Sequence, residues 1–191
     1  MTDTRKKILD EAQDLMQTRG YAEMTFQEIA TRVGIKKPSI VHHFPSKADL
    51  AAAVMDRYHR QFIKAMQDVA KDPSQGAWDC LEFYFNPYRH FAKSGELVCL
   101  SGALLGEFAI LPEEVKKLCK DFYAWHENWL TELFRQGRNS RQFHFKEEPK
   151  GLARHVFSSL QGALLIYRAS LEADHLEDVI KGIRTSLKVK N

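Results

Sequence analysis

The chain has 191 residues, and its 28 Lys and Arg residues nearly balance 25 Asp and Glu residues, for a formal net charge of +3. This balance argues against a protein that coats nucleic acid through overall positive charge. Apolar residues make up 44% of the chain, but no apolar run reaches the roughly 18 residues of a membrane-spanning helix. The N-terminus lacks the apolar core of a signal peptide, and three cysteines without C-x-x-C spacing suit a reducing compartment. We therefore expect a cytoplasmic protein with no membrane contact.

An amphipathic helix is predicted from the N-terminus to Gly20. Its apolar residues Ile8, Ala12, Leu15 and Met16 fall on one helical face, as expected for a helix packed on a core. Two shorter helices follow within residues 25–44. The order of these three segments predicts a small helical domain at the start of the chain.

The first of the two short helices has clear start and stop signals. Thr25 is a good N-cap, and Glu28 three residues later completes the pattern of a reciprocal capping box. Gly34 stands where a helix C-terminus favours a left-handed residue. The expected buried stripe of this helix consists of Phe26, Ile29, Ala30 and Val33.

The second short helix opens with two lysines and has Pro38 near its first position, where a missing N–H is harmless. Ile40 and Phe44, four residues apart, are expected to hold it on the domain. Ser46 with Asp49 predicts a further capping box at the start of the next helix. Helix, tight turn and helix together predict a helix-turn-helix, whose second helix enters the DNA major groove.

The charge pattern of this region supports the same interpretation. From Arg32 to Lys47 there are four Lys or Arg residues and no acidic residue. Positive charge concentrated on one short element is typical of a sequence-specific duplex binder. The alternative is a solvated loop between two packing helices, which would not require the caps, the turn glycine and the charge to coincide.

The order T-F-x-E-I-A-x-x-V-G-I and then K-x-S-I-x-H-H-F-P-S-K-x-x-L resembles the DNA-binding domain of TetR-family transcriptional regulators over about residues 1–50. The resemblance implies a helix-turn-helix domain at 1–50, with the motif itself at about 25–44. It also implies a helical regulatory and dimerisation domain at 51–191. Val41 departs from the family, which usually has an aromatic residue on the DNA backbone there. Val41 either packs on a thymine methyl or marks a lost contact.

The geometry of a recognition helix assigns roles to its residues, because its N-terminal side chains face base edges and its flanks face phosphates. Lysine suits guanine O6 and N7, so Lys36 and Lys37 are expected at or near bases. His42 and His43 stand where the family contacts phosphates, although His43 has the alternative of packing on the next helix. The full set expected at DNA is Thr25, Lys36, Lys37, Pro38, Ser39, Val41, His42, His43 and Lys47.

The remainder of the chain keeps a helical period throughout, so the predicted fold class is all-α. A kink is expected at Asn86–Pro87, and Gly137 is expected to close the helix that starts after Pro112. The helices are predicted at 46–70, 78–95, 97–111, 113–137, 150–173 and 174–190.

The last two predicted helices carry wide apolar faces. In the family, two such helices pair with the same two helices of a second subunit as a four-helix bundle. A palindromic operator read by one helix per subunit also requires a two-fold partner. We therefore expect a homodimer, with purely intramolecular packing as the alternative. The expected dimer residues are Val156, Leu160, Leu164, Tyr167, Val179 and Ile183.

Aromatic residues crowd the middle of the chain and are able to line an apolar cavity or to form ordinary core. The family resemblance favours a cavity for a small-molecule effector, with polar groups such as Glu107, His126 and Arg168 to orient it. The expected effector residues are Trp78, Tyr84, Tyr88, Phe91, Phe108, Phe122, Trp125, Trp129 and Gln161.

Cys99 precedes a Gly- and Ala-rich segment and resembles a cysteine in a branch of the family that includes sensors of electrophiles or oxidants. A reactive cysteine needs a lowered pKa, which the start of a helix or a nearby cation such as Lys93 would supply. The alternative is a small buried apolar residue. Cys80 and Cys119 are expected in the core.

Enzyme signatures are missing from the sequence, which has no G-x-S-x-G, P-loop or G-x-G-x-x-G motif. His126–Glu127 begins an H-E-x-x-H match, but Leu130 stands in place of the second histidine. We expect no catalytic residue, no metal site and no cofactor.

The predicted function is a ligand-responsive transcriptional regulator, expected to be a repressor of double-stranded operator DNA. A small apolar, aromatic or electrophilic effector between the middle helices would move the long fourth helix and change the spacing of the two recognition helices. An activator, or a helical binding or scaffold protein whose helix-turn-helix is structural only, remains as an alternative.

Overall fold

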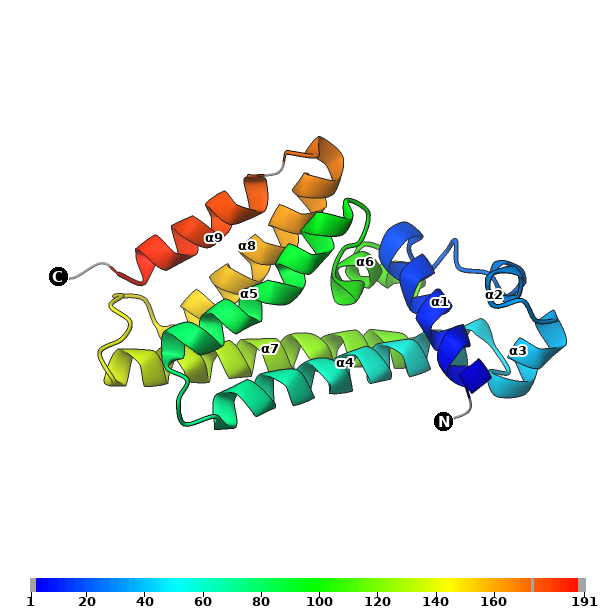
Figure 1. The fold of residues 1–191 in the computed structure, drawn as a ribbon, viewed down its shortest axis with the longest axis horizontal. Coiled ribbons are helices and arrows are strands. Elements are labelled where there is room, and N and C mark those ends of the chain that lie inside the picture. The colour runs from blue at the N-terminus through cyan, green and yellow to red at the C-terminus, as the bar shows by residue number, and fades with distance from the viewer. Residues whose placement is uncertain (1–2, 173, 189–191) are drawn as a thin grey trace. The chain divides into compact units, whose positions relative to one another are not determined.

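The computed structural model describes residues 3–172 and 174–188, and these residues form helices joined by short connections (Figure 1). Within the described ranges, the only β pairing is an isolated bridge between His144 and Lys188. The all-α prediction is confirmed. The α-helices are α1 Asp3–Arg19, α2 Phe26–Val33, α3 Lys37–His43, α4 Lys47–Lys71, α5 Ala77–Ser94, α6 Leu100–Gly106, α7 Glu113–Asn139, α8 Pro149–Ser170 and α9 His175–Ser186, with a 3-10 turn η1 at Phe108–Ile110.

The chain divides into two compact units. Unit 1 consists of Met1–Gln61 and Cys99–Phe122, and unit 2 consists of Phe62–Val98 and Tyr123–Asn191. The expected sequential boundary after residue 50 therefore differs from the observed division, because α6 and the first part of α7 join the N-terminal helices. Leu100 and Leu104 of α6 are fully buried, and α6 packs on α1 inside unit 1.

Unit 1 is held by the apolar faces that the sequence pattern predicts. Ile8, Leu15 and Met16 of α1 are fully buried, as are Ile29 of α2 and Ile40 of α3. Burying such side chains contributes about 1.5–3 kcal/mol each. In the predicted stripe of α2, the end residues are only half-buried, so the helix contacts the core mainly through its centre.

Unit 2 has an aromatic core built by α4, α5, α7 and α8. The Tyr84 hydroxyl lies 2.7 Å from His126 Nδ1, and the Tyr84 ring stacks on Trp129 at 5.3 Å between ring centroids. The Phe62 ring meets that of Tyr84 edge to face. These aromatic side chains thus pack against one another as ordinary core, which was the alternative to lining a cavity.

Two predicted helices differ from the observed ones. The segment 97–111 forms α6 and η1 rather than one helix, whereas α5 continues through Pro87 as the predicted helix 78–95 does. Helix α7 continues past Gly137 to Asn139. A Cβ at Gly137 would lie 2.1 Å from Phe143 Cδ2, so glycine is present there because the buried Phe143 ring packs directly against the helix backbone. The final positions of the two predicted C-terminal helices, at 173 and 189–190, lie outside the described residues.

An ion-pair cluster in unit 2 joins α7 to α8. Glu127 is only 8% exposed and accepts from Arg154 Nε at 2.5 Å and from the Tyr123 hydroxyl at 3.0 Å, and Lys150 Nζ lies 3.2 Å away. The hydrogen bond from Arg154 is the main cause that lowers the pKa of Glu127 from 4.5 to about 2. The native state therefore holds the ionised form more tightly than the unfolded chain does.

We expect this cluster to make stability depend on acid pH. Because the native pKa is lowered, the contribution is fully present above pH 4.5 and is lost as pH falls towards about 2. Wild type should lose about 1–2 kcal/mol more than Glu127→Gln over that window. Urea unfolding at several pH values measures this, with exposed Glu172→Gln as the matched control. Parallel pH profiles for wild type and Glu127→Gln would contradict the assignment.

Candidate nucleic-acid interface

Helices α2 and α3 form the predicted helix-turn-helix. Thr25 Oγ1 accepts from the Glu28 N–H at 3.2 Å and caps α2. Gly34 has φ of +74°, and the N–H of the next residue, Ile35, donates to the Ala30 carbonyl at 3.0 Å. A left-handed residue and this hydrogen bond end α2 and turn the chain into α3. The capping box of Ser46 and Asp49 is present in both directions at the start of α4.

Arg32 forms ion pairs within unit 1. Its guanidinium pairs with Asp14 of α1 at 2.8 Å and with Glu28 at 3.1 Å, and Arg19 also pairs with Glu28 at 2.9 Å. The Glu28 carboxylate thus binds arginines instead of completing the predicted capping box with Thr25. Of the four cations counted in residues 32–47, Arg32 stabilises the packing of α1 on α2.

The exposed face of α3 carries most of the residues expected at DNA. Lys36 is the N-cap of α3, and Lys37 is its first residue. Val41 is 42% exposed, so its methyl groups are available to a neighbouring surface, and His43 is half-buried with its ring 5.4 Å from that of His42. The exposed residues of this face are Lys36, Lys37, Pro38, Ser39, Val41 and His42.

Lys47 has partners inside unit 1. Its ammonium donates to the Ala22 carbonyl at 2.8 Å and sits 4.6 Å from the centre of the Tyr21 ring. Burial lowers the pKa of Lys47, while the nearby charge of Glu107 opposes that shift. Lys47 therefore holds the turn between α1 and α2, and its expected contact with a DNA phosphate stays a prediction.

Glu107 binds the same turn. Its carboxylate accepts from the Tyr21 N–H at 2.6 Å and from the Ala22 N–H at 2.8 Å. Gly20, with φ of +93°, allows this approach, because a Cβ there would lie 2.0 Å from Glu107 Oε1. We call this arrangement of Gly20, Tyr21, Ala22, Lys47 and Glu107 the turn clamp. Charge-assisted hydrogen bonds of this kind are roughly twice as strong as neutral ones.

The turn clamp was not predicted, and Glu107 was expected to orient an effector instead. Tyr21 and Glu107 are 86 residues apart, so no local pattern connects them. The sequence does place Gly20 at the end of α1, where the structure has a positive φ. A glycine there is consistent with a close approach to the backbone, but it does not identify Glu107 as the approaching group.

The nine residues expected to bind an effector do not line one cavity. Phe108 and Phe122 belong to unit 1, where the Phe122 ring packs on Tyr58 at 5.6 Å. Trp78 packs edge to face on Phe143 and donates to the Gln142 carbonyl. In unit 2, Tyr84, Tyr88 and Phe91 are buried, and Trp125 and Gln161 are half-buried.

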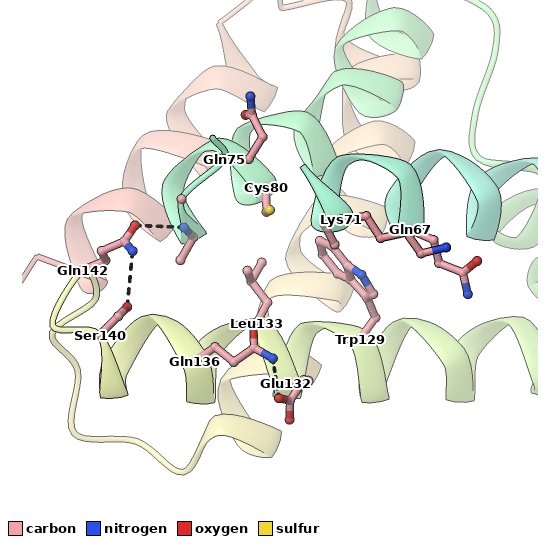
Figure 2. Close-up of a pocket in the computed structure, with 13 residues that line it drawn as sticks. Gln67, Lys71, Gln75, Cys80, Trp129, Glu132, Leu133, Gln136, Ser140 and Gln142 are labelled. Carbon is pink, nitrogen blue, oxygen red and sulfur yellow. Dashed lines mark hydrogen bonds between the residues drawn. The ribbon is translucent and has the colours of Figure 1, made fainter. Parts of the chain in front are cut away.

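Trp129 is the member of that set that lines the pocket in Figure 2. This pocket lies within unit 2, between the end of α4, the start of α5 and the second half of α7, and has a volume of about 580 Å³. The volume falls within the range of roughly 300–1,000 Å³ typical of small-molecule sites. Most of its polar lining comes from glutamines, none of which was among the expected effector residues.

Four of the six expected dimer residues are already buried inside unit 2, so little of their surface is open to a second copy. These residues are Val156, Leu160, Leu164 and Ile183. The exposed side of α8 instead carries Leu165 and Ile166, which are 49% and 52% exposed. Beside them, Gly162 of α8 and Gly182 of α9 line a shallow groove in which a helix could approach closely.

Cys99 is a buried N-cap of α6, and its Sγ lies 3.6 Å from the Tyr58 hydroxyl. Burial raises the pKa of Cys119 to about 12, with a smaller contribution from the neighbouring Cys99. Burial likewise raises the pKa of Cys80. Cys80 and Cys119 lie in the interior, as expected.

The described residues contain neither a metal-binding cluster nor a membrane-spanning helix. Over residues 3–172 and 174–188, no group of three or more His, Cys, Asp and Glu side chains is placed to hold a metal ion. No helix in that part of the chain combines the length and apolar character needed to cross a bilayer.

Comparison with known proteins supports the helix-turn-helix assignment. Residues 8–54 match the family described as bacterial regulatory proteins, tetR family. The HTH-type transcriptional repressor NemR of Escherichia coli (strain K12) is 22% identical over 184 residues, which cover 95% of this chain and 92% of NemR.

Two solved structures have the same fold. A TetR transcriptional regulator from Legionella pneumophila is 28% identical with a TM-score of 0.89, covering 98% of this chain and 99% of that one. The reduced form of Escherichia coli NemR is 21% identical with a TM-score of 0.86, and the match covers 99% of both chains.

Proposed function

Since this chain belongs to the TetR family of bacterial regulatory proteins, we propose that it represses transcription by binding operator DNA as a homodimer, and that an effector releases it. The observation that carries the proposal is the exposed face of α3, which presents Lys36, Lys37 and His42 after a helix capped by Thr25 and Gly34. Lysines at the start of a recognition helix suit guanine edges, and the histidine suits a phosphate. We place the protein in the cytoplasm.

The turn clamp supports a route by which a ligand would change DNA binding. Glu107 directly follows α6, and the chain on either side of the α6 segment, before Cys99 and after Phe122, belongs to unit 2. Helices α4 and α7 also continue from one unit into the other. A shift of these elements would pull Glu107 or Lys47 from the α1–α2 turn and move α3 with it. To release DNA, an effector must bind the shifted state better, typically by about 1–3 kcal/mol.

A salt series of DNA binding tests the proposal. Labelled DNA from upstream of the protein's own gene is titrated at several salt concentrations, with scrambled DNA of equal length as the control. A regulator should prefer the native sequence and lose affinity steeply between about 50 and 200 mM salt. Equal affinity for both DNAs at every salt concentration would favour the alternative of a helical binding protein whose helix-turn-helix is structural.

The proposed dimer uses the exposed side of α8 and α9. We expect Ile166→Glu to give a monomer with at least about tenfold weaker operator binding, because two α3 helices must be held about 34–36 Å apart to read both half-sites. Sedimentation velocity and DNA titration measure the two effects. The control is Ile110→Glu, which changes a residue of η1 that is 61% exposed. A dimeric Ile166→Glu variant would rule out this surface.

Cys99 is proposed as a second input that responds to electrophiles. Addition of its thiol to N-ethylmaleimide would place a bulky group at the start of α6, next to the Tyr58 hydroxyl. We expect N-ethylmaleimide to release wild type from DNA, Cys99→Ser to remain bound, and Cys119→Ser to behave as wild type. Release of Cys99→Ser at the wild-type rate would eliminate Cys99 as the sensor.

A further inference from the structure

The pocket in Figure 2 combines an apolar wall with an unusual number of carboxamides. Trp129, Leu133 and Cys80 supply apolar surface, and the Cys80 and Leu133 side chains point toward one another across the space. Gln67, Gln75 and Gln136 supply amide groups from α4, the α4–α5 connection and α7. An apolar wall with a few converging polar groups is the usual composition of a small-molecule site.

The charged groups at this pocket are not equivalent. Glu132 is bound by Arg135 at 2.7 Å and by the Gln136 amide at 2.5 Å, so its charge is already compensated. Lys71, on the last turn of α4, makes no hydrogen bond or ion pair with another described residue. The pocket therefore offers one uncompensated positive charge, which favours an anionic ligand.

The aromatic part of the pocket is held rigidly. The Trp129 ring stacks on Tyr84 and on Trp125, with 6.1 Å between the centres of the two indoles. Its indole N–H has no acceptor among the described residues and is a donor for a ligand. Figure 2 shows Trp129 beside Lys71 and Gln67, so one ligand can reach the ring, the ammonium and an amide together. Aromatic ligands gain binding free energy from such a ring beyond the area that they bury.

We propose that this pocket binds a planar aromatic anion of one or two rings, with its acidic group on Lys71 and its ring against Trp129. The carboxamides of Gln67, Gln75 and Gln136 both donate and accept, so they orient further polar substituents. A purely apolar effector, one of the classes considered from the sequence, would make no use of Lys71 or of these amides. The assignment of the ligand as the effector rests on the proposed regulatory function, whereas the binding itself does not.

The experiment uses 2-naphthoate as the anionic probe, with the isosteric neutral 2-naphthamide beside it. Each is titrated into the full chain by calorimetry and by quenching of tryptophan fluorescence. We expect one 2-naphthoate per chain with Kd below about 1 mM, and at least about tenfold weaker binding of the amide. Lys71→Met should weaken 2-naphthoate about tenfold and leave 2-naphthamide unchanged. Lys117→Met, at an exposed lysine of α7 outside the pocket, should change neither.

The outcomes separate the two proposals. Equal affinity for 2-naphthoate and 2-naphthamide, or unchanged 2-naphthoate binding by Lys71→Met, would overturn the anion site. Specific binding of 2-naphthoate that leaves operator affinity unchanged would overturn its assignment as an effector site. Failure of the ligand-free protein to prefer operator DNA would count against the proposed function and leave the binding site standing. Trp129→Phe, which keeps an aromatic ring, should reduce fluorescence quenching while retaining the preference for the anion.

Discussion

Gly20→Ala is expected to lower the free energy of unfolding by about 2.5–5 kcal/mol and to weaken operator binding by at least about tenfold. At φ of +93°, a Cβ costs about 1–2 kcal/mol in backbone strain. The new methyl group would also lie 2.0 Å from Glu107 Oε1. The Glu107 side chain is flexible and would move away, which breaks its hydrogen bonds to Tyr21 and Ala22 and adds a loss of about 1.5–3 kcal/mol.

A matched variant separates strain from the loss of the turn clamp. Gly95 also has a positive φ, +75°, but a Cβ there meets nothing within 4 Å. Gly95→Ala should therefore show the strain alone and should leave DNA binding unchanged, since Gly95 belongs to unit 2. Glu107→Gln keeps the size of the side chain but loses its charge, so it should reproduce the weaker DNA binding with a smaller loss of stability. Urea unfolding and DNA titration measure both quantities, and equal behaviour of Gly20→Ala and Gly95→Ala would refute a role for Glu107.

Lys37→Ala is expected to weaken operator binding by about 10- to 100-fold while leaving stability and the dimer intact. Lys37 is exposed at the first position of α3, so its removal costs no packing. Loss of one good base contact costs about 1–3 kcal/mol. The effect should be larger on operator than on scrambled DNA, because non-specific binding depends mainly on phosphate contacts.

Lys47→Met provides the contrast to Lys37→Ala. The ammonium of Lys47 donates to the Ala22 carbonyl inside unit 1, so its removal should lower stability. The salt dependence of DNA binding should stay near the wild-type slope, whereas the loss of a phosphate contact would reduce that slope by about 1. A reduced salt slope of DNA binding for Lys47→Met would instead show that Lys47 contacts a phosphate. Unchanged operator affinity for Lys37→Ala would remove Lys37 from the interface.

The amino-acid sequence by itself determined the features that depend on neighbours within about four residues. Thr25, Gly34 and the pair of Ser46 and Asp49 end or begin helices as expected, because caps act through backbone groups one turn away. The period of the apolar residues predicted the all-α fold and the buried faces of α1 to α3 for the same reason. The lysines at the start of α3, which were expected to face DNA, are likewise exposed.

Only the tertiary structure decided which partner each polar group has and which apolar face remains exposed. Lys47 was expected at DNA and Glu107 at an effector, and Arg32 was counted in the positive charge of residues 32–47. All three bind groups brought close by folding, in one pair from 86 residues away. Val156 and Leu160 belong to an apolar face that the sequence predicts, yet packing inside unit 2 consumes it. Helical period shows that a face is apolar but not what covers it, because that depends on contacts between elements distant in sequence.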